Sequence, residues 1–155
     1  MHDRRGALLM KNTSTHDSFV TATLGFAASR AGDGVAYVAL VEADVRNETL
    51  VRVVFRCRPL PALCGRDIAY AAAEAVAAHL LRRGLRAVAL ALDAASLERD
   101  LAEHAPVPAA LTIPYVRLRC TLNRFAHADL RVVDDRLTRD LGARARAEVA
   151  LAVAA

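Results

Sequence analysis

The feature that most constrains the fold of this chain is a change of hydrophobic period between residues 65 and 92. Apolar residues recur every four positions from Ile68 to Leu80 in "GRDIAYAAAEAVAAHLLRRG", and Gly84 follows two arginines, as at a helix C-terminus. The next run, "LRAVALAL", is continuously apolar, which is typical of a central strand covered on both faces. A helix that leads directly into a buried strand predicts an α/β fold.

More strands are predicted on either side of this block. Upstream, "FVTAT" and "VAYVALVEA" predict two strands around the loop "GFAASRAGDG", and residues 48–58 alternate with a period of two. Downstream, "SLERDLAEHA" predicts a short helix, and the alternating run "TIPYVRLRCTL" predicts a fifth strand. The spacing over residues 123–141 predicts a last helix with Asn123 as its N-cap, which Gly142 either ends or kinks. The predicted order, β-β-β-α-β-α-β-α, corresponds to a mixed five-stranded sheet flanked by helices.

Length and composition indicate one globular domain. The chain has 155 residues, of which 55% are hydrophobic and 25% charged. We expect a flexible tail over residues 1–17, with Met10 as an alternative start, and a single domain over residues 18–155. No apolar run is long enough to cross a bilayer, so no membrane partner is predicted. Three cysteines without a CxxC spacing predict reduced thiols and a cytoplasmic protein.

The chain carries a small excess of positive charge. Its 21 Lys and Arg residues and 17 Asp and Glu residues give a net charge of +4, which either suits a polyanionic partner or reflects composition alone. Several arginines share one side of a predicted strand: Arg52, Arg56 and Arg58 on the third strand, and Arg117 and Arg119 on the fifth. If those sides face one groove, they form a surface for phosphates; otherwise they are solvated surface residues.

The block from Gly65 to Ser96, "GRDIAYAAAEAVAAHLLRRGLRAVALALDAAS", resembles a segment of ribonuclease H-like proteins of the reverse-transcriptase-like group, NNEAEYxALxxGLxxAxxxGxxxVxVxxDS. Tyr70, Gly84 and Asp93 fall in step without a gap. "TATLGFAASRAGDGVAYV" resembles the first hairpin of that family, and "NRFAHADL" resembles its NxxADxLA motif at the start of the last helix. The resemblance covers about residues 19–140 and implies a ribonuclease H-like fold.

The resemblance also implies a chemistry and the loss of most of it. Ribonuclease H enzymes hydrolyse the RNA strand of a hybrid with two divalent metals held by four acidic residues. Those positions fall here on Leu24, Ala69, Asp93 and His127, and only one of them carries a carboxylate. The resemblance therefore implies a degenerate site in which Asp93 and His127 remain and Asp93 is a weak candidate ligand for Mg²⁺ or Mn²⁺. No other cofactor is expected.

Alternatives stay open at each of these positions. Asp93 is either a remaining metal ligand or an N-cap for the helix that follows it. His127 is either part of the remnant site or an ordinary packed or solvated side chain. Asp33, in the first hairpin loop, is a further acid that could rebuild a metal site.

We predict low-specificity binding of nucleic acid, either duplex or RNA·DNA hybrid. The residues expected to bind it are Arg52, Arg56, Arg58, Arg117, Arg119 and Asn123. One alternative is a residual metal-dependent hybrid ribonuclease. The other is a protein-interaction scaffold or homodimer that uses "RLTRDLGARARAEVALAVAA" as its contact helix.

Overall fold

The structure, a computed structural model, describes residues 19–43, 47–102 and 106–155. In these residues five strands form one sheet in the order β3-β2-β1-β4-β5. β1, β2 and β3 are antiparallel neighbours, and β4 lies parallel to both β1 and β5. The strands are β1 (Phe19–Ala28), β2 (Asp33–Glu42), β3 (Glu48–Arg56), β4 (Ala87–Leu92) and β5 (His127–Val132). The predicted tail over residues 1–17, with Met10, lies outside the described residues.

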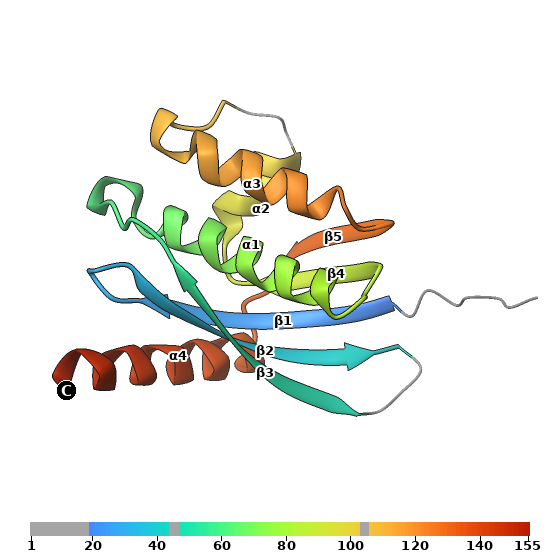
Figure 1. Cartoon of the computed structure of the whole chain (residues 1–155), viewed down its shortest axis with the longest axis horizontal. Coiled ribbons are helices and arrows are strands. Elements are labelled where there is room, and N and C mark those ends of the chain that lie inside the picture. Colours follow the sequence, from blue (N-terminus) through green and yellow to red (C-terminus); the bar gives the residue numbers. More distant parts are fainter. Residues whose placement is uncertain (1–18, 44–46, 103–105) are drawn as a thin grey trace, which may run out of the picture.

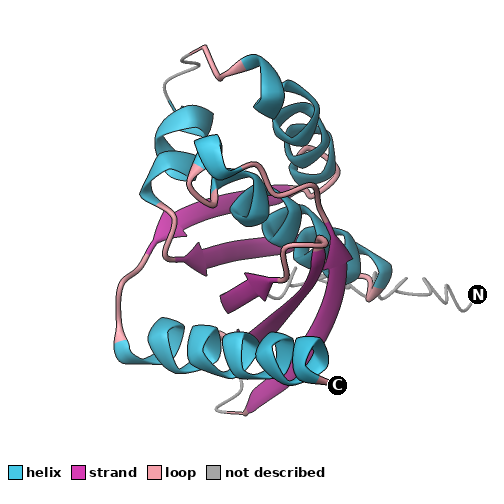
Figure 2. Ribbon diagram, turned by 90° about the vertical axis from the view of Figure 1, so that its left-hand side faces the viewer, coloured by secondary structure: helices cyan, strands magenta, loops and turns pink. Residues whose placement is uncertain are grey.

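The helices cover both faces of the sheet (Figure 1). One face carries α1 (Arg66–Arg82), α2 (Ala95–Ala102) and α3 (Thr112–Leu122), and the other carries α4 (Arg136–Ala154). Figure 2 shows the sheet between these two layers. Short 3₁₀ turns, Pro61–Leu63 and Ala109–Leu111, precede α1 and α3. None of the helices in the described ranges is long and apolar enough to span a bilayer.

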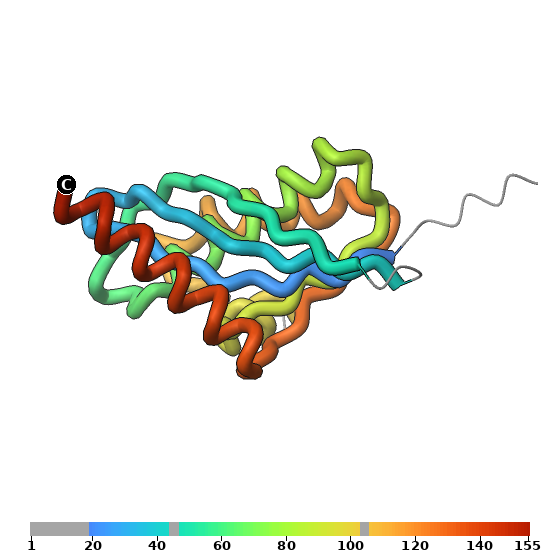
Figure 3. Tube along the Cα trace, turned by 90° about the horizontal axis from the view of Figure 1, so that it is seen from below, coloured from blue at the N-terminus to red at the C-terminus, as the bar shows by residue number. Residues whose placement is uncertain are grey.

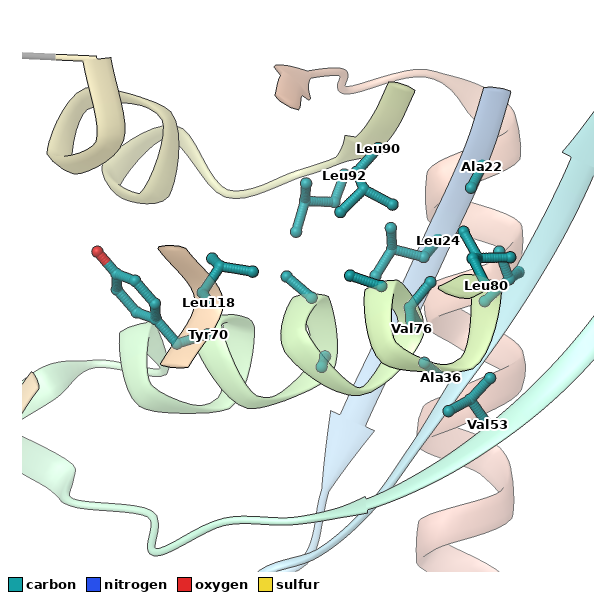
Figure 4. Packing of buried hydrophobic residues seen from close by; sticks show 14 of the residues in the cluster. Ala22, Leu24, Ala36, Val53, Tyr70, Val76, Leu80, Leu90, Leu92 and Leu118 are labelled. Carbon is teal, nitrogen blue, oxygen red and sulfur yellow. The ribbon is translucent and has the colours of Figure 1, made fainter. Parts of the chain in front are cut away.

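The main core lies between α1 and the sheet (Figure 4). Val76 and Leu80 of α1 are buried against the central strands, and all six residues of β4 are buried, as the continuous apolar run predicts. The chain leaves α1 through Gly84, whose φ of +82° is a backbone conformation that glycine adopts without strain. The predicted helix and central strand are thus confirmed.

A second, smaller core lies between α4 and the opposite face of the sheet. Val35, Tyr37 and Ala39 of β2 contact Leu141 and Ala145 of α4. Figure 3 shows α4 crossing the strands obliquely on this face. Residues on β2 therefore face both cores alternately, which explains why the strand is buried from Gly34 to Leu40.

The fold class is confirmed as a mixed five-stranded sheet flanked by helices, but two predicted elements were assigned to the wrong residues. Residues 112–122 form helix α3 and not the fifth strand, which is the short segment His127–Val132. The alternation in "TIPYVRLRCTL" does not mark a buried strand face, because Leu118 and Thr121 are buried at helical spacing while Val116 is half exposed.

The last helix also begins later than predicted. Asn123 is the C-cap of α3 rather than an N-cap, so the NxxADxLA-like motif was placed one element too early. Asp135 is the N-cap of α4, and its side chain accepts a hydrogen bond from the Thr138 amide in a capping box. The helix continues through Gly142 to Ala154 instead of ending there.

Candidate functional site

Two exposed aspartates follow the ends of the parallel strands β4 and β5. Asp93 follows β4 directly, and the Val133 amide donates a hydrogen bond to the Leu92 carbonyl, which brings the chain after β5 to the same edge. Asp134 is therefore a neighbour of Asp93 at this edge. Sequence reasoning missed Asp134 because the fifth strand had been assigned to residues 112–122. An aspartate pair directly before the last helix, "DD" at residues 134–135, was the signal that could have found it.

The other positions implied by the family resemblance are aliphatic and buried. Leu24 lies on β1, is 1% exposed and belongs to the core beneath α1. Ala69, in the first turns of α1, is 5% exposed. No cluster of three or more His, Cys, Asp or Glu side chains suitable for a metal occurs among residues 19–43, 47–102 and 106–155. Among the described residues, the side chains at these positions supply too few oxygen ligands to fit a pair of hard divalent cations.

His127 does not join Asp93. It is the first residue of β5 and pairs with Ala87 at the start of β4, whereas Asp93 follows the other end of β4. Six residues of extended strand separate the two levels by about 20 Å. The His127 ring lies instead 6.3 Å from the Phe19 ring. The expectation of a remnant site made of Asp93 and His127 is therefore wrong, because His127 is on a strand and not on the last helix.

The two remaining candidate metal ligands, Asp33 and Asp93, differ in their side-chain partners. Asp33 begins β2, and its carboxylate accepts a hydrogen bond from the Arg56 guanidinium at 2.6 Å. This ion pair joins β2 to β3, and Asp33 is not one of the carboxylates at the end of β4. Asp93 is exposed and forms no side-chain hydrogen bond or ion pair with another described residue, so the expectation that it caps α2 is wrong, while its role as a metal ligand stays a prediction.

The predicted arginine surface is divided between the two sides of the sheet. Arg52 and Arg56 lie on the side of β3 that faces α4, while Arg117 and Arg119 lie on α3 in the opposite layer. Arg58 follows β3 and is exposed, as is Asn123 at the end of α3. These residues do not form one groove, because residues 112–122 are a helix over the other face of the sheet.

Most of these arginines also have intramolecular partners. Arg52 donates from Nε to Glu148 Oε1 at 2.7 Å, and Arg56 pairs with Asp33. Arg119 donates to the Leu101 carbonyl at 2.7 Å and to the Tyr115 hydroxyl at 3.0 Å. Arg52 and Arg119 each use two nitrogens in these contacts, which leaves them poorly placed to take phosphates, whereas Arg56 uses Nη1 alone and keeps other donors free.

Another group of arginines is exposed around two adjacent turns. The amides of Ala126 and His127 donate to the Arg86 carbonyl at 2.9 Å and 3.3 Å, so the α1–β4 turn lies beside the α3–β5 turn. None of the four arginines there forms an ion pair with another described residue. We call this group the basic turn cluster: Arg82, Arg83, Arg86 and Arg124.

The charge of this cluster affects the pKa of a neighbouring histidine, His79. Burial lowers the pKa of His79, and the positive charges of Arg82 and Arg83 lower it further. Two members of the cluster, Arg82 and Arg83, thus act electrostatically on His79.

Solved structures of ribonucleases H are similar to this chain in fold. The ribonuclease H1 of Halobacterium salinarum NRC-1 matches with a TM-score of 0.64 and 19% identity, over 84% of this chain and 96% of that one. The N-terminal ribonuclease H domain of a Mycobacterium tuberculosis protein matches with a TM-score of 0.63 and 13% identity, over 88% and 96% of the two chains.

LC11 ribonuclease H1, isolated from compost by a metagenomic approach, matches with a TM-score of 0.64 and 11% identity, over 88% of this chain and 99% of that one. The same enzyme in complex with an RNA/DNA hybrid matches with a TM-score of 0.56 and 12% identity, over 83% and 91%. No family model and no curated protein matches the sequence. The strand order, the helix layers and these similarities together show that the chain has the ribonuclease H-like fold.

Proposed function

We propose that this chain is a catalytically degenerate ribonuclease H-like domain that binds nucleic acid with low sequence specificity. The basic turn cluster is the observation that carries this proposal. It offers four exposed guanidinium groups without acidic partners among the described residues, on a fold whose solved examples include a complex with an RNA/DNA hybrid. The phosphate backbone of a duplex or hybrid is the ligand that such a group recognises.

The proposed loss of hydrolysis rests on Leu24 and Ala69. A two-metal mechanism needs carboxylates that hold both ions on either side of the scissile phosphate. Two of the four implied positions carry aliphatic side chains in the core, which supply no oxygen ligand. Asp93 and Asp134 provide two exposed carboxylates, too few to hold a pair of Mg²⁺ ions.

The proposed binding acts through phosphates and not through bases. Contacts between arginines and phosphates release counterions, so affinity should fall steeply as salt increases. If the cluster neutralises about three or four phosphates, the slope of log K against log salt should be about −3 to −4. Because phosphate contacts carry no sequence information, hybrids of different sequence should bind about equally.

The test compares two triple variants of equal charge change. Binding of a labelled RNA·DNA hybrid is measured by fluorescence anisotropy at several salt concentrations. The cluster variant replaces three arginines with alanine, and the control replaces three exposed arginines on other elements. The two sets are Arg83, Arg86 and Arg124 for the cluster, and Arg30, Arg99 and Arg146 for the control.

We expect the affinity of the cluster variant to fall by at least about tenfold. The slope of log K against log salt should also become much less steep, since each lost phosphate contact reduces its magnitude by about one. The control variant should lose much less. Equal losses in both variants would show that net charge, and not this cluster, drives binding. Failure of the unaltered protein to bind hybrid or heparin would refute the proposal as a whole.

A further inference from the structure

Strand β3 is an edge of the sheet with an exposed apolar surface. It is the terminal strand in the order β3-β2-β1-β4-β5, so its outer backbone groups have no partner strand among the described residues. Its register with β2, in which Val54 pairs with Val35 and Leu50 with Ala39, places both side chains on the face that carries α4. Val54 is 63% exposed and Leu50 is 45% exposed. An edge strand of this kind is a template for pairing with another strand.

The sequence of β3 is complementary to itself when reversed. Arg52 is the middle residue of Glu48–Arg56, so an antiparallel pair of β3 strands centred on Arg52 uses their full length. In that register Glu48 lies opposite Arg56 of a second copy, and Leu50 lies opposite Val54 of that copy. Side chains directly opposite each other in an antiparallel pair interact, and here they match in charge and in polarity.

The central pair of arginines does not oppose this register. Each Arg52 donates to Glu148 of its own chain, and the Tyr37 hydroxyl donates to the same carboxylate at 2.6 Å. These two hydrogen bonds lower the pKa of Glu148, which keeps the carboxylate charged beside Arg52. Each Arg52 is thus neutralised locally before it meets its counterpart.

The end of α4 extends this surface. Val54 lines an open groove with Val149, Ala152 and Val153 of α4. Val153 is 70% exposed and lies on the same side of the molecule as the exposed residues of β3. Leu50 of a second copy, placed opposite Val54, would close the open side of this groove and bury apolar surface on both chains.

We propose that two copies of this chain pair through antiparallel β3 strands about a twofold axis at Arg52, which joins their sheets into one of ten strands. The occupant of the edge is a second copy because the charges and apolar side chains of β3 match those of the same strand reversed. This dimer is independent of nucleic-acid binding, so either proposal can fail without the other.

Charge exchange across the interface tests the register. Glu48→Arg and Arg56→Glu are made singly and together, and the mass of each full chain is measured by sedimentation velocity over a range of concentrations. Each single variant places like charges opposite each other twice per dimer, so dimerisation should weaken by about tenfold or more. The double variant restores both pairs, and an equimolar mixture of the two single variants should form a heterodimer.

Two controls separate the interface from other effects. Asp33→Asn removes the intrachain partner of Arg56 without altering either proposed interchain pair, and Glu98→Arg changes the charge of an exposed residue on α2. Both should dimerise like the unaltered protein, and circular dichroism checks that every variant is folded. A monomeric unaltered protein at about 100 µM, or single variants that neither dissociate nor recombine on mixing, would overturn the proposal.

Discussion

At the scale of single residues, a buried polar group joins the start of α1 to α2. Asp100 accepts hydrogen bonds from the Tyr70 hydroxyl at 2.9 Å and from Arg66 Nη2 at 2.7 Å. Tyr70 is fully buried and Asp100 is 6% exposed, so neither group can exchange its partner for water. The family-like motif identified Tyr70 from the sequence, but Asp100 lies thirty positions away and only tertiary structure reveals it as the partner.

We expect Asp100→Ala to lower the free energy of unfolding by about 3 kcal/mol, because it leaves the buried hydroxyl and the partly buried guanidinium without their acceptor. Tyr70→Phe should cost less, about 1–2 kcal/mol, since Arg66 still pairs with Asp100. Urea unfolding followed by circular dichroism measures both. A loss for Asp100→Ala no larger than for an exposed aspartate such as Asp140 would contradict this role.

Tyr70 also predicts a loss of stability at alkaline pH. Burial raises the pKa of Tyr70, and its hydrogen bond to Asp100 raises it further. Above a pH of about 10, the unfolded chain releases this proton and the folded chain holds it, so unfolding becomes more favourable as pH increases. Ultraviolet titration of the folded protein should show that Tyr70 resists ionisation. Tyr70→Phe should remove part of the alkaline destabilisation and leave the absorbance change of the folded protein unaltered. A smaller absorbance change in this variant would mean that Tyr70 ionises in the folded protein, and would contradict the assignment.

At the scale of elements, the contact between α4 and β1 depends on a close backbone approach. A Cβ atom at Gly25 would overlap backbone atoms of Leu141 and Gly142 in α4. At Gly142 a Cβ atom would meet only the end of the Arg146 side chain, at 3.2 Å. The two glycines therefore differ in how they tolerate a side chain. Gly25 must lack one so that α4 can lie on the sheet, whereas Gly142 has room for one.

We expect Gly25→Ala to destabilise the protein by about 3 kcal/mol, since backbone atoms cannot yield and α4 must move away from the sheet. Gly142→Ala should be neutral or stabilising by up to about 1 kcal/mol, because alanine favours the helix and the Arg146 side chain can move. Thermal and urea unfolding of the two variants gives the comparison. Similar stabilities for both would show that α4 does not depend on this approach.

The elements differ in how far sequence could predict them. α1 and β4 were predictable because one long amphipathic period and one fully buried run leave little ambiguity. α3 and β5 were not, because α3 is a helix with few buried positions and β5 is a short, partly exposed strand, so neither has a strong period. Because the fifth strand was predicted at residues 112–122, the last helix was predicted to begin too early. Asp134 was therefore missed, and His127 was expected near Asp93, from which it is distant.

At the scale of the whole molecule, the fold is that of ribonucleases H, but its arginines are not gathered where the sequence suggested. The sheet separates Arg52 and Arg56 from Arg117 and Arg119, which no single-sequence pattern could show. Four of the exposed arginines that form no ion pair with another described residue lie instead at the basic turn cluster. This distribution, together with aliphatic residues at two positions where metal ligands are implied, is the ground on which we propose binding of nucleic acid without hydrolysis.

The most direct test is incubation of a labelled RNA·DNA hybrid with the unaltered protein in Mg²⁺ and in Mn²⁺, with bound and cleaved hybrid measured in the same samples at two salt concentrations. We predict a complex that dissociates as salt is increased, with the RNA strand intact in both metals. Metal-dependent cleavage that is lost in Asp93→Asn would contradict this, and would mean that Asp93 and its neighbours hold a working metal site.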